Sequence, residues 1–352
     1  MPPADPNGKT IKITLDDLAS VSAPEAEAPA LPSSGSAKVY GSINEPADPK
    51  LAVSEEKSNI QLQAWFYLGA AGLTGALLGW GICEPRFVDG DGHRWGNLWI
   101  IPAIVALLCF GFGIAESIVE RSAKKALVRG LICLPLGVAL GFIFEGIANV
   151  IFVIGLAIAA QMGAQTERNP AIWVVRGFAW MVFGAAGGVV YGIVGLSAKK
   201  TLYGVLGGVI GAGLGGLLFD PIALLTRGGA PSRAVGFALV GAATGVAVGL
   251  VESALKDRWL YVTAGPLAGK QFILYKPRTV LGSDQSCDIY LFKDSNILKE
   301  HAVIEIAGSR ILLRAVGETY LGGQPVRQQV LANDSALQIG RYAFRYRERQ
   351  RN

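Results

Sequence analysis

The sequence has little charge, almost no histidine and few cysteines. Charged residues make up 17% of its 352 residues, whereas soluble domains average about 25%, which argues against an ordinary cytosolic enzyme. Only two histidines are present, His93 and His301, so histidine-based catalysis has few places to occur. The four cysteines are scattered, which argues against a disulfide framework or a zinc site and predicts buried free thiols. They are Cys83, Cys109, Cys133 and Cys287.

Catalytic motifs are also missing. We find no nucleophile elbow, phosphate-binding glycine loop, metalloprotease motif or kinase motif. The stretch Asp89–His93 begins like a calcium loop, but Arg94 stands where that loop requires glycine. We therefore expect no enzymatic activity, no cofactor and no metal. No basic region leads into an apolar run at the N-terminus, so we expect no secretory signal peptide and expect the first apolar helix to direct insertion.

Glycine, in contrast, is abundant and unevenly distributed. Of the 46 glycines, 35 lie between residues 61 and 260, where charged residues become sparse. The hydrophobic fraction is 51% and the mean hydropathy is +0.40. Small residues let helices approach closely in lipid. We therefore expect a glycine-rich, polytopic α-helical membrane domain over residues 59–257, in contact with the lipid bilayer.

Six apolar segments subdivide that domain, and most are long enough to cross the ~30 Å hydrocarbon core of a bilayer. They lie near 61–83, 97–120, 127–160, 171–196, 202–225 and 232–255. The third is too long for a simple span, so it should tilt, break near Glu145-Gly146 or extend past the bilayer. GIAESIVERSAKKAL (113–127) resembles GIVGLSAKKTL (192–202) and GLVESALK (249–256). Three two-helix repeats are the hypothesis that follows.

The basic residues predict the topology. Eight basic residues lie in or beside the loops that follow the second, fourth and sixth segments. Six lie in or beside the loops at the opposite ends of the segments. This bias and the even number of segments favour both termini in the cytoplasm of a multi-pass plasma (cell inner) membrane protein. The same topology accounts for much of the net charge of +5, so no nucleic acid is expected as a partner. Residues 1–58 are rich in Pro, Ala, Ser and acidic residues and predict a disordered tail.

From Trp259 onward short alternating strands predict a small all-β sandwich over residues 258–352. The stretches that define it are TVLGSDQSCDIYLFKDSNILKEHAVIEI (279–306), GETYLGGQPV (317–326) and LQIGRYAFRY (337–346). They resemble the forkhead-associated (FHA) domain, a β-sandwich whose loops bind phosphothreonine peptides. The resemblance covers a quarter of the chain, and the membrane region resembles no family that we identify.

The phosphate-reading positions of that family are substituted here. The resemblance places Ser283 where the family has an arginine after Gly282, Leu298 where it has a serine, and Gly317 where it has an asparagine. Arginine supplies a bidentate charge for phosphate, and none of these three replacements does. The resemblance implies a structural role for His301 and allows weak contributions from Ser283 and Lys299. We therefore expect these loops to bind a protein partner independently of phosphate.

Two further patterns lie within the apolar segments. Glycines repeat at four-residue spacing, which places them on one helix face and predicts close packing, either within the bundle or between chains in a homo-oligomer. They include Gly75, Gly79, Gly184, Gly188, Gly192, Gly207, Gly211, Gly215, Gly241, Gly245 and Gly249. Glu116, Glu145 and Glu252 lie inside apolar runs, and Asn149 follows Glu145 by one helical turn. Such polar groups either form a polar or ion site, or pair with basic residues near the membrane surface.

The sequence thus favours a non-enzymatic, membrane-anchored scaffold that recruits a cytosolic or membrane protein through a degenerate FHA-like sandwich. Two alternatives remain open. One is a signalling adaptor that reads phosphothreonine through substitute residues. The other is an ion channel or transporter subunit that uses the intramembrane acids.

Overall fold

A computed structural model describes residues 60–88, 94–164, 166, 168–226, 229–308 and 310–349. All of these fall within one compact unit, Val39–Asn352. The predicted tail over residues 1–58 and the loop Asp89–His93 lie outside the described residues, so the structure does not bear on them.

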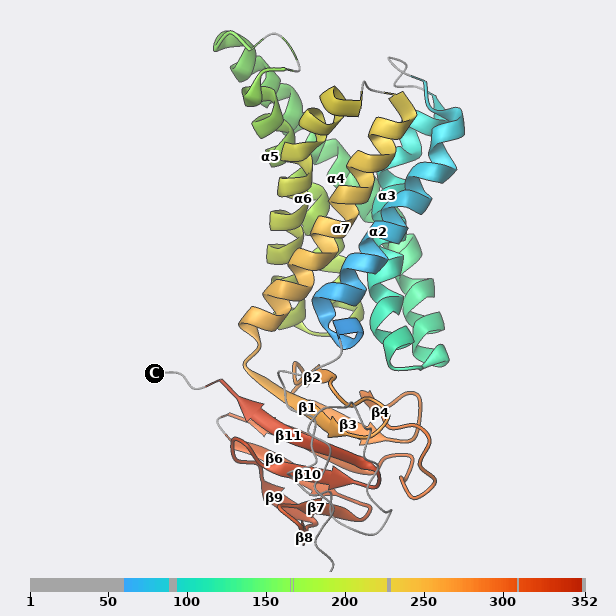
Figure 1. The fold of residues 1–352 in the computed structure, drawn as a ribbon, viewed down its shortest axis with the longest axis vertical. Coiled ribbons are helices and arrows are strands. Elements are labelled where there is room, and N and C mark those ends of the chain that lie inside the picture. The colour runs from blue at the N-terminus through green and yellow to red at the C-terminus, as the bar shows by residue number, and fades with distance from the viewer. Residues whose placement is uncertain are drawn as a thin grey trace, which may run out of the picture. The chain divides into compact units, whose positions relative to one another are not determined.

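The described residues form a helical part followed by a β part (Figure 1). The helical part contains six helices that are long and apolar enough to cross a membrane, as the sequence predicts. These are α2 (Ala64–Cys83), α3 (Trp95–Val119), α4 (Ala123–Gln161), α5 (Pro170–Val194), α6 (Ala198–Thr226) and α7 (Gly229–Leu255). Helix α4 runs unbroken through Glu145-Gly146, so the break considered for that segment does not occur.

Two helix connections have the same local structure. The second residue after the end of each helix, Arg121 after α3 and Leu196 after α5, has a positive φ, of 56° and 51°. Each is followed by a serine whose side chain accepts a hydrogen bond from the backbone N–H three residues on: Ser122 from Lys125, and Ser197 from Lys200. A side-chain acceptor at this position satisfies a free N–H at the start of the next helix. The matching turns coincide with the similar stretches 113–127 and 192–202.

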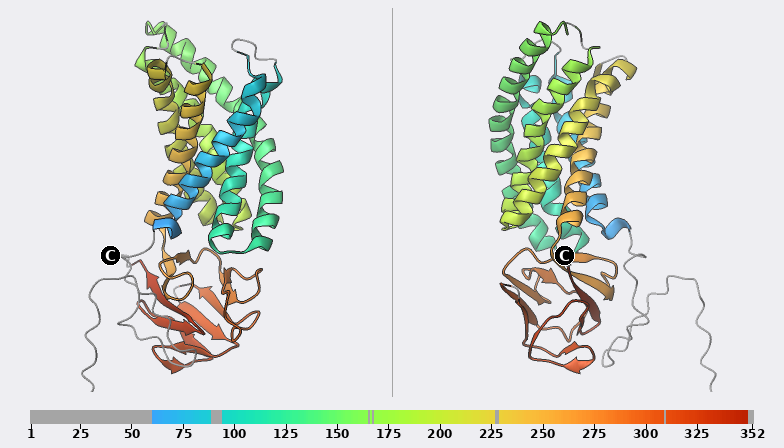
Figure 2. Two further views of the ribbon diagram at one scale, coloured as in Figure 1. Left: turned by 45° about the vertical axis from the view of Figure 1, so that its right-hand side comes forward. Right: turned by 90° about the vertical axis from the view of Figure 1, so that its left-hand side faces the viewer.

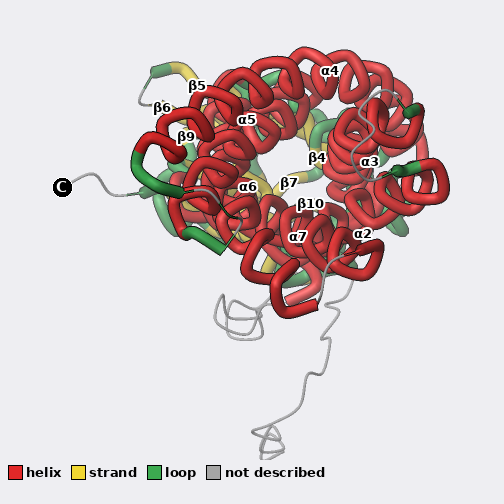
Figure 3. Tube along the Cα trace, turned by 90° about the horizontal axis from the view of Figure 1, so that it is seen from above, coloured by secondary structure: helices red, strands yellow, loops and turns green. Residues whose placement is uncertain are grey.

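The helices follow one another around the bundle in sequence order, and α7 closes the circle against α2 (Figures 2 and 3). Helix α3 also contacts α5, and α4 lies at the rim. Only 11% of an apolar 18-residue stretch of α4 is buried, compared with 39–56% of the corresponding stretches in the other five helices. The long third segment is therefore the helix that the rest of the chain covers least.

Glycine determines how closely these helices meet. A Cβ atom added at Gly184 would lie 1.9 Å from the carbonyl oxygen of Gly208, and one at Gly241 would lie 2.2 Å from that of Gly72. The eleven glycines of the four-residue rows all lie against neighbouring parts of the same chain. Their nearest neighbours are Leu107, Ile104, Gly208, Gly204, Thr201, Val248, Thr244, Val240, Gly72, Leu68 and Trp65. The backbones come too close for a larger residue at these points.

The β part consists, among the described residues, of two sheets (Figure 1). The strands are β1 (Arg258–Ala264), β2 (Gln271–Ile273), β3 (Arg278–Gly282), β4 (Ile289–Tyr290), β5 (Ala302–Ala307), β6 (Arg310–Ala315), β7 (Thr319–Leu321), β8 (Gln324–Pro325), β9 (Gln328–Val330), β10 (Ala336–Ile339) and β11 (Tyr342–Glu348). One sheet has the order β2-β1-β11-β10-β7-β8, and the other has the order β4-β3-β5-β6-β9.

The two sheets enclose one apolar core. Alternate residues of facing strands contribute to it, including Leu260 and Val262 of β1, Ile304 of β5 and Phe344 of β11, as the two-residue period of a strand requires. The predicted β-sandwich is therefore confirmed. The four cysteines are buried and free, also as predicted.

Candidate functional site

Three loops of the sandwich meet around His301. The first contains Gly282, the second Leu298 and the third Gly317. A Cβ atom at Gly282 would lie 2.0 Å from the carbonyl oxygen of Lys299, so only glycine permits this approach of two loops. Next to it the backbone N–H of Ser283 donates to the carbonyl of Leu298 at 2.9 Å. The structure thus brings Gly282, Ser283, Leu298 and Lys299 together.

His301 joins the second and third loops. It is buried, and its Nδ1 accepts a hydrogen bond from the Leu298 N–H at 3.1 Å. Its Nε2 lies 3.0 Å from the carbonyl oxygen of Glu318, which assigns the proton to Nε2. The backbone N–H of Gly317 donates to the His301 carbonyl at 3.1 Å. Both ring nitrogens are thus occupied in holding loops.

Gly317 packs directly against that histidine. A Cβ atom at Gly317 would lie 2.2 Å from Cε1 of the His301 ring. No side chain fits at this position unless His301 moves, so the asparagine of the family cannot be accommodated in this loop as it stands.

The outer surface of these loops is partly apolar. Leu298 is 47% exposed and Val316 is 71% exposed. Beside them lies an open groove of about 380 Å³, lined by Val316, Gly317, Glu318, Thr319, Pro325 and Arg327. The positions that the resemblance assigns to phosphate reading therefore present a leucine and a glycine, with valine nearby, and carry no arginine.

The acids that the sequence places within the apolar segments divide into two groups. Glu116 and Glu252 line the same cavity of about 100 Å³ between the helices and the sandwich. Glu116 accepts ion-paired hydrogen bonds from Arg129 and Lys200, each at 2.9 Å. Glu252 is buried and accepts from the Tyr191 hydroxyl at 3.1 Å. Glu145 and Asn149 are not in this cluster, and within the described parts of the chain their side chains form no hydrogen bond or ion pair.

The axis of the bundle is apolar. A cavity of only about 30 Å³ lies there, lined by side chains that include Ile104, Leu108, Trp180 and Phe237. The paired Glu116 and this apolar lining do not favour an ion path along the bundle.

A buried ion network at the junction of helices and sandwich escaped sequence analysis. Lys270, in the turn between β1 and β2, donates to Glu120 at 3.0 Å, and both side chains are at most 3% exposed. Lys125 donates to the same carboxylate at 3.3 Å. A lone lysine in a Gly-Lys-Gln stretch gives no signal of burial in the sequence.

Tyr275 forms a second contact across the junction. Its hydroxyl donates to the Glu252 carboxylate, and Lys200 lies over its ring at 5.6 Å. Burial, together with the Glu252 charge, raises the pKa of Tyr275 well above its ordinary value. The phenol therefore remains a neutral hydrogen-bond donor.

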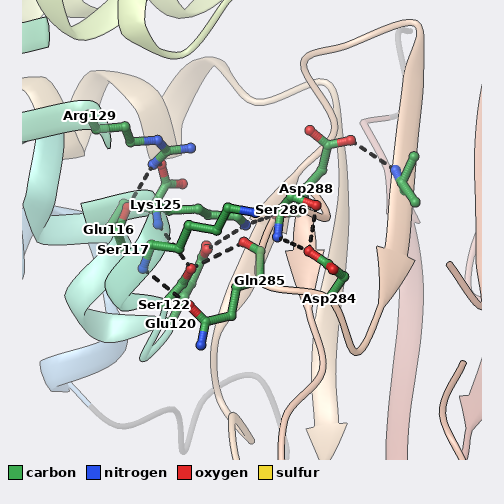
Figure 4. A network of polar contacts seen from close by, with 12 residues as sticks. Glu116, Ser117, Glu120, Ser122, Lys125, Arg129, Asp284, Gln285, Ser286 and Asp288 are labelled. Atoms are coloured by element: carbon green, nitrogen blue, oxygen red, sulfur yellow. Dashed lines mark hydrogen bonds and ion pairs between the residues drawn. The ribbon is translucent and has the colours of Figure 1, made fainter. Parts of the chain in front are cut away.

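The loop that follows Gly282 also touches the helices (Figure 4). The carbonyl oxygen of Gln285 accepts from the Ser122 hydroxyl at 3.2 Å, and its side-chain oxygen accepts from the Lys124 N–H at 3.1 Å. Lys125 donates to the carbonyl of Asp288 at 2.9 Å. One of the three candidate loops is thus held on its far side by the turn between α3 and α4.

Comparison with known proteins gives matches to this sandwich. A family model described as the cytoplasmic domain of an inner membrane component of T3SS matches residues 261–350. The glycogen accumulation regulator GarA of Mycolicibacterium smegmatis is 36% identical over 86 residues, which are 24% of this chain and 54% of that protein. The oxoglutarate dehydrogenase inhibitor of Corynebacterium efficiens is 35% identical over 86 residues, 24% of this chain and 60% of that protein.

Solved structures give similar matches. An FHA domain solved in a study of phosphothreonine-dependent FHA interactions is 20% identical, with a TM-score of 0.25, and the match covers 27% of this chain and 99% of that one. The FHA domain of the CT664 protein from Chlamydia trachomatis is 25% identical, with a TM-score of 0.25, over 27% of this chain and all of that one. The C-terminal quarter of the chain is similar to the FHA family.

The similarity to FHA domains leaves most of the molecule unmatched. The aligned stretch spans little more than half of the two curated relatives, and these matches do not reach the six helices. The names of these relatives describe a regulator and an inhibitor, and the family model describes a domain of a membrane component. The exposed Leu298 and Val316 and the groove beside them make the FHA-like loops the candidate functional site.

Proposed function

We propose that this chain is a non-enzymatic scaffold of the cell inner membrane that recruits a protein partner through its FHA-like loops. Helices α2–α7 would anchor it, with the N-terminus and the sandwich in the cytoplasm. The family model for the cytoplasmic domain of an inner membrane component supports this location, as do the length and composition of the six helices.

The partner contact is independent of phosphate in this proposal. The observation that carries it is the surface of the three loops: Leu298 is exposed where the family has a serine, and His301 leaves no room for a side chain at Gly317. A phosphate dianion requires charged or polar donors, whereas an exposed leucine and valine favour apolar side chains of a partner. Lys299 and Arg327 are exposed nearby and suit an acidic residue at the edge of such a contact.

Co-purification of the full-length chain in mild detergent tests this proposal. Leu298→Asp is compared with Val330→Asp, a matched control because Val330 is 51% exposed, pairs with Leu312 of β6 and does not line the groove. We expect Leu298→Asp to lower partner recovery about 30-fold, as loss of a central apolar contact does. Val330→Asp should retain the partner, and phosphatase treatment should not change recovery. A partner that phosphatase releases from the wild-type chain would instead establish phosphothreonine reading.

A further inference from the structure

Helix α4 carries two polar residues on a surface that the rest of the chain leaves uncovered. Asn149 is exposed and Glu145 is half-buried. Apolar exposed side chains flank them on both sides along the helix, Leu131 at 67% before them and Val153 at 61% after them. Along the helix axis, the two polar groups thus lie between exposed apolar residues.

The path of α4 explains why this surface is open. Its first half packs on α3, where a Cβ atom at Gly141 would lie 2.7 Å from Pro102. Its second half packs on α5, where a Cβ at Gly155 would lie 2.4 Å from Val175. Glu145 and Asn149 fall where the helix crosses from one neighbour to the other. At Gly146, between them, an added Cβ would meet nothing within 4 Å.

Lipid alone does not suit this surface. Hydrocarbon offers no hydrogen bonds, so an amide and a carboxyl exposed to it stay unsatisfied. The two polar groups therefore call for a polar partner against this surface of α4.

We propose that a second copy of this chain covers this surface, with the two α4 helices packed side by side about a twofold axis along the membrane normal. Copies inserted with the same topology present α4 to each other in parallel and at the same level. An amide both donates and accepts, so Asn149 is complementary to Asn149 of the other copy. The donor of one Asn149 also lies one turn from the Glu145 acceptor of the other, and Gly146 allows the helices to approach closely.

This inference rests on the proposed membrane location, which carbonate extraction of membranes tests separately. A chain that carbonate releases contradicts the membrane location itself. A chain that stays in the membrane but never pairs contradicts only the α4 dimer.

The direct test is energy transfer between donor-labelled and acceptor-labelled full-length copies in vesicles of phosphatidylethanolamine and phosphatidylglycerol. Wild-type transfer should fall with lipid dilution along a monomer–dimer curve. Asn149→Leu should weaken pairing about threefold to thirtyfold, the range for interhelical hydrogen bonds in membranes. Ile147→Ala is the matched control, because Ile147 is 47% exposed and lies two residues away on another side of the helix; it should leave pairing unchanged.

Cross-linking gives an independent measurement. Gly146→Cys should form a disulfide-linked dimer in oxidised membranes, whereas Ile147→Cys should not, above the background of the four buried native cysteines. Any of three results would overturn the proposal. The two cysteine variants could cross-link equally, Asn149→Leu could leave energy transfer unchanged, or the wild-type chain could be monomeric at every lipid ratio. Cross-linking of Gly146→Cys to a different membrane protein would overturn it as well.

Discussion

The absence of a single Cβ atom sets the distance between two helices at many points of this bundle. Gly184 and Gly208 face each other, as do Gly188 and Gly204, so α5 and α6 meet backbone to backbone. The four-residue spacing in the sequence reveals which glycines share a face. It does not reveal which face meets which neighbour, because that depends on how the helices are ordered around the bundle.

Gly184→Ala should destabilise the bundle by about 1–3 kcal/mol, the range for forcing extra volume into a packed core. The added Cβ would lie 1.9 Å from the carbonyl oxygen of Gly208, a backbone atom that cannot turn aside. Gly81→Ala is the matched control, since a Cβ there meets nothing within 4 Å and alanine favours helix over glycine. Thermal unfolding followed in detergent should show a lower midpoint for Gly184→Ala only; equal midpoints would contradict the assigned packing.

Buried polar residues were the hardest to predict. Sequence reasoning selected Glu116 and Glu252 because they lie in apolar runs, and the structure places both at one cavity. Their partners Lys200 and Tyr275 come from α6 and the sandwich. Such a pairing is fixed by tertiary structure and leaves no periodic pattern in the sequence, so the partners Lys200 and Tyr275 could not be predicted.

Between elements, the decisive contact joins the β1–β2 turn to the end of α3. Lys270 projects from the turn into a nearly solvent-free site, where Glu120 neutralises it and the ring of Phe272 lies 4.8 Å from its Nζ. A charge buried in this way is stable only with its partner. The pair therefore ties the position of the sandwich to α3.

Lys270→Met should loosen the junction by about 3–5 kcal/mol, because it leaves a buried carboxylate short of one partner; the remaining Lys125 favours the lower end of that range. Lys276→Met is the matched control: the Lys276–Asp288 pair is 34% and 27% exposed and should contribute about 0–1 kcal/mol. Trypsin cleavage after Lys256, which lies between α7 and β1, and after Arg258, the first residue of β1, reports the loosening. Faster cleavage in Lys270→Met alone is expected, and similar rates in both variants would show that this pair does not hold the junction.

For the whole molecule, sequence patterns predicted the helical part and the β-sandwich. They did not predict the contacts between these two parts. Hydropathy and length gave the six helices, and FHA-like stretches gave the sandwich, because both signals are local. The docking of Gln285 on Ser122 is not local, since 163 residues separate the two. The same holds for the candidate site: its loop residues follow from the resemblance, whereas its attachment to the helices required the three-dimensional structure.

The proposed topology makes the last prediction. If α2–α7 cross the membrane and the sandwich is cytoplasmic, the α3–α4 turn that contacts it must be cytoplasmic too, and the opposite ends of the helices must face outward. Lys124 and Arg86 are exposed at these two ends, and the buried native thiols should react slowly. A membrane-impermeant maleimide should therefore label Arg86→Cys in intact spheroplasts, and Lys124→Cys only after the membrane is permeabilised. Labelling of Lys124→Cys alone in intact spheroplasts would reverse the orientation, and equal labelling of both before permeabilisation would exclude a membrane-spanning bundle.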